Sequence, residues 1–208
     1  MLGSNGGMRM SDDTKFFIPV LLGTSRIGRQ SIHIAQLVLQ SLAMRPDVTT
    51  DLIDLAEYVF PIMQERLDEM VCQPHRLQEF SQKLNNIDGL VIVAPEYKNS
   101  YPGALKNAFD YLKAGILRRK PVGIATVSSG GCGGVNCLAQ LRLVCLAMGG
   151  VPIPASLSVA KVHEIVNSSG NLCDEKVAAQ CKQFLDELIW YTSAMTCWRR
   201  ADSGPRNA

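Results

Sequence analysis

Residues 89–106 read GLVIVAPEYKNSYPGALK, and this stretch decides the fold. Its first part, 89–94, is an uninterrupted apolar run, as expected of a strand that is covered on both faces. A polar segment with two prolines follows at once. Pro102 then stands where a helix can begin at little cost, because the N–H that proline lacks would have no helical partner there. The stretch therefore predicts a buried strand, a loop rich in hydrogen-bonding groups, and a helix over 102–112.

The same alternation of strand and helix extends in both directions along the chain. Short apolar runs at 16–22, 48–55, 121–127 and 151–159 predict four more strands. Apolar residues at helical spacing predict helices over 31–44, 74–86, 135–148 and 175–192. Strands that alternate with helices form a parallel sheet with helices on both faces, so the predicted fold class is α/β.

Pro19 lies inside the first of these apolar runs. A proline removes a hydrogen-bond donor from a strand ladder, and the first strand of such a sheet is expected to be central. Two interpretations remain open at this point. Either the strand begins at Val20, or it contains a bulge at the proline.

The composition predicts one compact domain over 15–197. Of the 208 residues, 47% are hydrophobic and 19% are charged, which is enough apolar material for a substantial core. Residues 1–14 are expected to be a disordered leader, in part of vector origin, and 198–208 a loose tail. The net charge of +2 argues against a nucleic-acid surface. No apolar run approaches the roughly 20 residues that a membrane span needs.

Seven cysteines are scattered along the chain in an odd count, and no CxxC pair occurs. This pattern favours free thiols in a reducing compartment, and hence a cytoplasmic protein, over a disulfide framework. It also gives no reason to expect a zinc site.

Three loops follow neighbouring strands of the predicted sheet, where ligands of open parallel sheets bind. They are GTSRIGRQS at 23–31, PEYKNSYPG at 95–103 and SSGGCGG at 128–134. The first offers hydroxyl and guanidinium groups at the start of a helix, a combination that can hold a phosphate. A simple helix cap with solvated arginines is the alternative. The loop lacks both the Walker ending and the G-x-G-x-x-G pattern.

The third loop carries four glycines in seven residues, so its backbone amides can approach a ligand closely. Amides arranged around a concavity can stabilise the anionic edge of a ring. The alternative is a flexible loop that only caps the next helix.

Together the motifs resemble a known family. G-[ST]-x-R-x-x-R-x-S at 23–31, P-E-Y-x-x-S-x-P-G-x-L-K-N-A-x-D at 95–110 and G-G-x-G-G at 130–134 are similar to those of the NADPH-dependent FMN reductases. These flavodoxin-like proteins include quinone, azo-dye and chromate reductases, and the resemblance covers about residues 16–150. It implies a doubly wound, five-stranded parallel sheet of order 2-1-3-4-5.

The resemblance also implies which residues bind FMN. Those expected at the phosphate are Thr24, Ser25, Arg26 and Ser31. Those expected along the ring are Pro95, Glu96, Tyr97, Lys98, Asn99, Ser128, Ser129, Gly130 and Gly131. The family usually has asparagine where Lys98 stands. Either this lysine contributes only its backbone N–H, or its ammonium lies near the flavin and raises the reduction potential.

The implied activity is transfer of a hydride from NADPH or NADH to FMN, followed by delivery of two electrons to an acceptor in a ping-pong sequence. Quinones, flavins, azo compounds and metal oxyanions are the implied acceptors. No catalytic side chain and no metal are expected. The family further implies a homodimer or homotetramer formed through the helices at 102–112 and 135–148.

Individual side chains are given modest roles. Glu96 is expected to bond backbone amides or an arginine rather than to act as an acid or base. His33, His75 and His163 are not expected to be catalytic, and Cys132 is expected to be a half-buried filler of the glycine loop.

Two other functions remain compatible with the sequence. A flavodoxin-type electron carrier would share the fold and FMN, although such carriers tend to be acidic and this chain is slightly basic. A non-redox binding module could use the same scaffold, because fold alone does not decide function.

Overall fold

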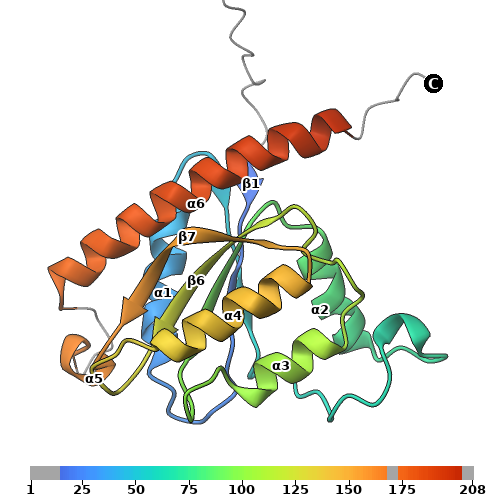
Figure 1. The fold of residues 1–208 in the computed structure, drawn as a ribbon, viewed down its shortest axis with the longest axis horizontal. Helices are drawn as coiled ribbons and strands as arrows, with labels where there is room; N and C mark the ends of the chain where they lie inside the picture. The colour runs from blue at the N-terminus through green and yellow to red at the C-terminus, as the bar shows by residue number, and fades with distance from the viewer. Residues whose placement is uncertain (1–14, 168–172, 203–208) are drawn as a thin grey trace, which may run out of the picture.

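A computed structural model describes residues 15–167 and 173–202 of the chain (Figure 1). Its centre is a five-stranded sheet in which every neighbouring pair is parallel. In spatial order the strands are β4 (Leu52–Asp54), β2 (Val20–Leu22), β5 (Leu90–Pro95), β6 (Pro121–Val127) and β7 (Val151–Val159). Numbered along the chain, this is the order 2-1-3-4-5 that the resemblance implied.

The first two predicted strands are each divided. A short parallel pair, β1 (Phe16–Phe17) with β3 (Val48–Thr49), precedes the main sheet. The carbonyl of Pro19 accepts a bond of 3.0 Å from Val91 N–H, but the proline has no N–H to give, and β2 begins at Val20. Of the two interpretations of Pro19, the later strand start is therefore the correct one.

Helices cover both faces of the sheet. On one face lie α1 (Ser31–Ala43), α5 (Val162–Ile165) and α6 (Glu175–Asp202); on the other lie α2 (His75–Asn85), α3 (Gly103–Asp110) and α4 (Val135–Ala147). A 3₁₀ turn, η1 (Leu67–Glu69), sits in the loop between β4 and α2. Neither η1 nor the four-residue α5 was predicted from the sequence.

The apolar run in β5 is explained by these two layers. Val91 and Val93 pack with α1 and α6, whereas Leu90, Ile92 and Ala94 pack with the helices of the other face. Every residue of β5 is buried, so alternation between polar and apolar positions has no place there.

The prediction for the C-terminal segment was wrong. Helix α6 continues to Asp202, so 198–202 is helical rather than a loose tail. The guanidinium of Arg199 donates to the carboxylate of Asp88 at 3.0 Å and to the carbonyl of Arg119 at 2.8 Å. This side chain anchors the last turns of α6 to the segments that precede β5 and β6. Residues 203–208, and the predicted leader at 1–14, lie outside the described residues.

Across the ranges that the structure describes, the helices all fall short of the length and apolar character needed to cross a membrane.

Candidate functional site

The three polar loops leave one edge of the sheet side by side, because they follow the adjacent parallel strands β2, β5 and β6. Ladder hydrogen bonds continue into each loop. Gly23 N–H donates to Val93 at 2.8 Å, Glu96 N–H to Val127 at 2.9 Å, and Ser128 N–H to Val159 at 2.9 Å. The sheet therefore fixes where each loop begins.

The middle loop contains a tight two-residue turn at Lys98-Asn99. Tyr97 and Ser100 exchange both backbone hydrogen bonds, at 2.8 and 3.0 Å, and form an isolated antiparallel bridge. Lys98 and Asn99 take positive φ angles of 51° and 61°. This is the type I′ geometry, which suits asparagine and glycine and disfavours lysine. The turn leaves both side chains exposed beside the strand ends.

Gln140 of helix α4 stabilises this turn by two hydrogen bonds. The Gln140 side-chain amide donates to the carbonyl of Asn99 at 2.7 Å and accepts from the Ser100 hydroxyl at 2.6 Å. Gln140 was not among the predicted site residues. No motif could have identified it, because its role depends on a segment 40 residues earlier in the chain.

Glu96 joins the middle loop to the third. Its carboxylate accepts hydrogen bonds of 3.0 Å from the backbone N–H groups of Asn136 and Cys137 in the first turn of α4. The residue preceding α4, Gly134, has no side chain to cap the helix. Glu96 therefore supplies the cap from another loop, which confirms the prediction that it bonds backbone amides.

Tyr97 joins the middle loop to the first. Its hydroxyl lies 3.3 Å from the hydroxyl of buried Thr24, and that hydroxyl also accepts from Arg26 N–H at 3.3 Å. The guanidinium carbon of Arg26 lies 5.8 Å from the centre of the Tyr97 ring, within the range of a cation–π contact. Thr24, Arg26 and Tyr97 thus form one cluster.

At the start of α1, Ser31 is only 1% exposed, yet its hydroxyl has no hydrogen-bond partner among the described residues. No side chain caps this helix, and the nearby Arg29 is paired with Asp54. A buried hydroxyl without a partner is costly and uncommon. An anionic oxygen placed here would meet the Ser31 hydroxyl and the positive end of α1, so these residues fit a phosphate.

The third loop presents an exposed segment on a fixed base. Ser128 is half-buried, and its hydroxyl donates to the carbonyl of Gly130 at 2.9 Å. Thr126 donates to the carbonyl of Gly133 at 2.7 Å, which ties the far end of the loop to β6. Residues 129–132 are exposed between these anchors.

Cys132 is among these exposed residues, so the prediction that it is a half-buried filler was wrong. The next cysteine along the chain, Cys137, is buried, and its thiol lies 3.8 Å from the carbonyl of Pro95. Burial, together with the neighbouring Glu96 carboxylate, raises the pKa of this thiol to about 12. Cys137 therefore stays protonated and unreactive at neutral pH. The cysteines all lie within the described residues, and no disulfide links any two of them.

Most of the predicted residues come together at this edge, with differences in exposure. Thr24, Ser31 and Pro95 are buried, whereas Ser25, Arg26, Lys98, Asn99, Ser129, Gly130 and Gly131 are exposed. Pro95 is the last residue of β5 and belongs to the sheet rather than to the loop. His33, His75 and His163 lie on α1, α2 and α5, outside the three loops. Within the described residues no group of three or more His, Cys, Asp or Glu side chains is placed to hold a metal.

Comparison with known proteins gives concordant matches. The family model described as NADPH-dependent FMN reductase matches residues 18–164. An FMN-dependent NADPH-azoreductase from Staphylococcus saprophyticus is 27% identical over 178 residues, covering 82% of this chain and 92% of that protein. The corresponding azoreductase from Staphylococcus haemolyticus is 25% identical over 183 residues, covering 84% and 94%.

Solved structures share the fold. The flavoenzyme NAD(P)H:(acceptor) oxidoreductase FerB from Paracoccus denitrificans has a TM-score of 0.70 at 24% identity, covering 86% of this chain and 98% of that one. The apo form of the NADH:FMN oxidoreductase EMOB has a TM-score of 0.69 at 22% identity, covering 86% and 90%. At these identities the structural likeness establishes the α/β, flavodoxin-like architecture.

Proposed function

The chain belongs to the NADPH-dependent FMN reductase family and is an oxidoreductase, and on this premise we propose that it uses FMN to carry electrons from NADPH or NADH to small acceptors. The proposed acceptors are quinones, free flavins, azo compounds and metal oxyanions. The names of relatives with similar sequences, FMN-dependent NADPH-azoreductases, support azo compounds among these acceptors.

The observation that carries the proposal is that hydrogen bonds connect the three loops to one another. Tyr97 contacts Thr24 of the first loop, and Glu96 bonds the first turn of α4 directly after the third loop. Gln140 fixes the turn between these contacts. A loop that only connected a strand to a helix would need none of these long-range bonds.

The residues present fit FMN at both ends of the cofactor. Ser31, Thr24, Ser25 and Arg26 would hold its phosphate, and the unpartnered Ser31 hydroxyl supports this placement. The ring would be held by the segment Pro95, Glu96, Tyr97, Lys98 and Asn99, and by Ser128, Ser129, Gly130 and Gly131. When bound, FMN supplies the redox chemistry, namely acceptance of a hydride and delivery of two electrons.

The protein groups contribute positioning and electrostatics rather than acid–base or nucleophilic chemistry. Glu96 is committed to the amides of Asn136 and Cys137, so its carboxylate is not available as a general base. The exposed glycine loop offers backbone N–H groups, and Lys98 brings a cation to the same edge. Donors fixed in this way favour negative charge without reorganising during the reaction.

We further propose that NADPH and the acceptor occupy the same open side of the site in turn, which is a ping-pong order. Initial rates measured at several fixed acceptor concentrations would then give parallel double-reciprocal lines. Intersecting lines would contradict this order while leaving the cofactor assignment intact.

The phosphate assignment is tested by Arg26→Ala, with Arg118→Ala as a matched control at an exposed arginine away from the loops. Loss of a charge-assisted contact is expected to raise the dissociation constant of FMN by about ten- to a hundredfold. The control should bind FMN like the parent. Equal FMN affinity in the Arg26→Ala variant would overturn this assignment.

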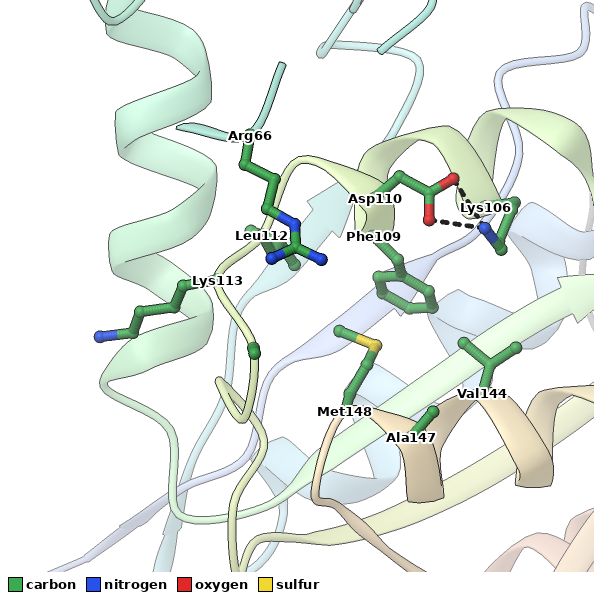
Figure 2. Close-up of a pocket in the computed structure, with 10 residues that line it drawn as sticks. Arg66, Lys106, Phe109, Asp110, Leu112, Lys113, Val144, Ala147 and Met148 are labelled. Atoms are coloured by element: carbon green, nitrogen blue, oxygen red, sulfur yellow. Dashed lines mark hydrogen bonds and ion pairs between the residues drawn. The ribbon is translucent and has the colours of Figure 1, made fainter. Parts of the chain in front are cut away.

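A homodimer, or a tetramer built from dimers, is proposed on the face formed by α3 and α4. Helix α4 exposes apolar side chains at Val135, Leu143 and Leu146, with exposed fractions of 52%, 68% and 58%. Beside them a cavity of about 300 Å³ opens between the two helices (Figure 2). Its floor is apolar, and Arg66, Lys113 and the ion pair of Lys106 with Asp110 stand at its rim.

An exposed apolar row beside an apolar cavity is the arrangement expected of a surface that a second copy covers. Light scattering on the eluted protein should give a dimeric or tetrameric mass, and Leu143→Arg should reduce it. A parent that is monomeric at micromolar concentration would contradict the proposal.

The absence of disulfides among the described cysteines supports a cytoplasmic location, as proposed from their spacing.

A further inference from the structure

The C-terminal half of α6 exposes both tryptophans of the chain. Trp190 is 65% exposed and Trp198 is 77% exposed, and Ala194, midway between them, is also exposed. Residues four apart lie on the same side of a helix, so these three residues form one row, here called the tryptophan stripe. The ring of Trp190 also makes an edge contact with Tyr191, with 5.0 Å between the ring centroids.

The tryptophan stripe points away from the core. The side of α6 that meets the sheet is formed by other residues, including Phe184, Leu185 and Leu188, all of which are almost fully buried. Figure 1 shows α6 running along the outside of the molecule above the sheet. Helices α3 and α4 cover the opposite face of the sheet, so an oligomer contact through them would leave the stripe uncovered.

The charge of α6 changes along its length. Its first half carries the carboxylates of Glu175, Asp186 and Glu187, whereas 188–200 contains no aspartate or glutamate. The exposed guanidinium of Arg200 follows directly after the stripe. The part of α6 that exposes the tryptophans is therefore aromatic and basic, without a carboxylate of its own.

Further cations lie beside the end of α6. Arg199 donates to the carbonyl of Arg119 at 2.8 Å, which brings the exposed residues Arg118 and Arg119 next to the last turns. Burial, and then the charges of Arg199 and Lys113, lower the pKa of Lys120 to about 8, which shows that the exposed Lys113 is also near. The exposed cations at this end are here called the basic group: Lys113, Arg118, Arg119 and Arg200.

We propose that the tryptophan stripe and the basic group form a docking surface for the headgroup region of an anionic phospholipid bilayer. Tryptophan favours the boundary between headgroups and acyl chains, because its ring is apolar and carries one polar N–H. Exposed arginine and lysine are attracted by the negative potential of anionic lipid. The carboxylate of Asp88 at this end does not cancel that attraction, because it is paired with Arg199 at 3.0 Å. Docking of this kind needs no membrane-spanning helix.

The area of the stripe favours a bilayer over a protein partner. If a fully exposed tryptophan presents about 250 Å², the two exposed fractions amount to roughly 350 Å². A stable protein interface removes about 800 Å² from each partner. Reversible attachment to a bilayer instead combines a small inserted apolar area with electrostatic attraction. Binding is therefore expected to need both parts of the surface and to weaken as salt is added.

Vesicle binding by the FMN-loaded full chain tests the proposal. The protein is mixed with vesicles of phosphatidylcholine alone, or of equal parts phosphatidylcholine and phosphatidylglycerol. The bound fraction is measured by co-sedimentation, and the tryptophan emission is recorded on the same samples. Both tryptophans of the chain lie in the stripe. We expect binding, and a shift of the emission to shorter wavelength, with the anionic vesicles only.

Two variants separate the aromatic part from the electrostatic part. Trp190→Ala combined with Trp198→Ala should weaken binding at least about tenfold, because the inserted apolar area is lost. Arg200→Glu should weaken it at least about fivefold, which is the contribution of one cation near an anionic surface. The matched control is Arg76→Glu, the same charge change at an exposed arginine of α2 on the other face of the sheet. It should bind like the parent, and every variant should retain FMN.

The proposal is overturned if the parent binds neither kind of vesicle or binds both equally. It is also overturned if Arg76→Glu weakens binding as much as Arg200→Glu does. Parent-like binding by the variant without tryptophan would leave a contact made by charge alone, which contradicts the role of the stripe. An emission shift that appears without vesicles while the mass of the protein doubles would assign the stripe to a protein partner instead.

This test is independent of the proposed function, because no residue of the three loops is altered. Loss of vesicle binding would leave the FMN assignment standing, and loss of FMN binding would leave the docking surface standing.

Discussion

At the scale of single residues, Lys98 shows most clearly how the site constrains the chain. The type I′ turn requires positive φ at Lys98. This conformation is unfavourable for a residue with a Cβ, and lysine has no short polar side chain that could offset the cost by a local hydrogen bond. Asparagine, which the resemblance leads one to expect here, adopts positive φ more readily. The turn forms despite this cost because it is stabilised by hydrogen bonds of the flanking residues Tyr97 and Ser100 and of Gln140 in α4.

Lys98→Asn is therefore expected to raise the free energy of unfolding of the FMN-free protein by about 0.5–1 kcal/mol. Lys98→Ala is the control, since it removes the ammonium but keeps a Cβ at the same φ. Urea unfolding of the three proteins measures the difference. Equal stabilities for asparagine and lysine would show that the turn is not strained.

Ser31→Ala should separate stability from binding. Removing a buried hydroxyl that lacks a partner should stabilise the FMN-free protein by about 1 kcal/mol. The same change should weaken FMN binding about tenfold, because the proposed phosphate contact is lost. Ser81→Ala, in α2 and away from the loops, serves as control in thermal unfolding and FMN titration. A variant that loses stability without losing affinity would place Ser31 in a structural role instead.

Sequence reasoning at this scale could find residues whose role is local. Thr24 and Ser31 lie in a recognisable strand–loop–helix motif, and the structure buries both. Gln140 was missed, and the amides of Asn136 and Cys137 were not foreseen as the partners of Glu96. Their roles depend on which loop the fold brings against α4, and this is not encoded in the spacing of the residues themselves.

At the scale of elements, the junction of the glycine loop with α4 places the strictest steric limit on its residues. Gly134 has a φ of 79°, and a Cβ at this position would lie 2.8 Å from the Cβ of Thr126. Gly131 in the same loop has no atom within 4 Å of the corresponding position. The two glycines therefore differ sharply in what a methyl group would meet.

Gly134→Ala is expected to lower the free energy of unfolding by about 2–4 kcal/mol, from backbone strain and the clash together. Gly131→Ala should change it by less than about 0.5 kcal/mol. Chemical denaturation of the FMN-free variants measures both values. Similar effects from the two substitutions would contradict the geometry of this junction.

The length of α6 shows a limit of sequence periodicity. Over 193–200 the one buried residue is Thr196, which is polar, so the apolar pattern fades while the helix continues. The last turns are held by hydrogen bonds of Arg199 to Asp88 and Arg119, which lie 111 and 80 residues earlier in the chain. Such partners become visible only once the fold is known.

At the scale of the whole molecule, buried thiols make the free energy of unfolding depend on pH in the alkaline range. Burial raises the pKa of Cys145 to about 12 and that of Cys181 to about 11. An unfolded cysteine has a pKa of about 8.5, so the unfolded chain loses these protons first. Their contribution to stability is complete below this value and is lost as pH rises toward the folded pKa. Lys120 acts in the opposite sense, because burial lowers its pKa to about 8.

The pH dependence is isolated by comparing the parent with Cys145→Ala, in which Lys120 and the other thiols are unchanged. Between about pH 9 and 11, the parent should lose up to about 1.4 kcal/mol more stability per pH unit than the variant. Urea unfolding at a series of pH values provides the comparison. Identical slopes would mean that the Cys145 thiol ionises in the folded state as it does in the unfolded one.

The overall architecture could be predicted because its determinants repeat along the chain. Five apolar runs alternate with helical periodicity, and parallel sheets with right-handed connections allow few arrangements of such a series. The division of the first two strands could not be predicted in full: Pro19 marked it in the first strand, and no residue marked it in the second. The site was predictable to the level of three loops, and the bonds that unite them were not.

The central claim is that these loops form one cradle for a phosphorylated flavin, and a titration of the cofactor-free protein with FMN and with riboflavin tests it most directly. We expect one FMN per chain, bound at least about a hundredfold more tightly than riboflavin, which lacks the phosphate that Ser31 and Arg26 would hold. Equal affinity for the two flavins, or no binding of FMN, would contradict the account.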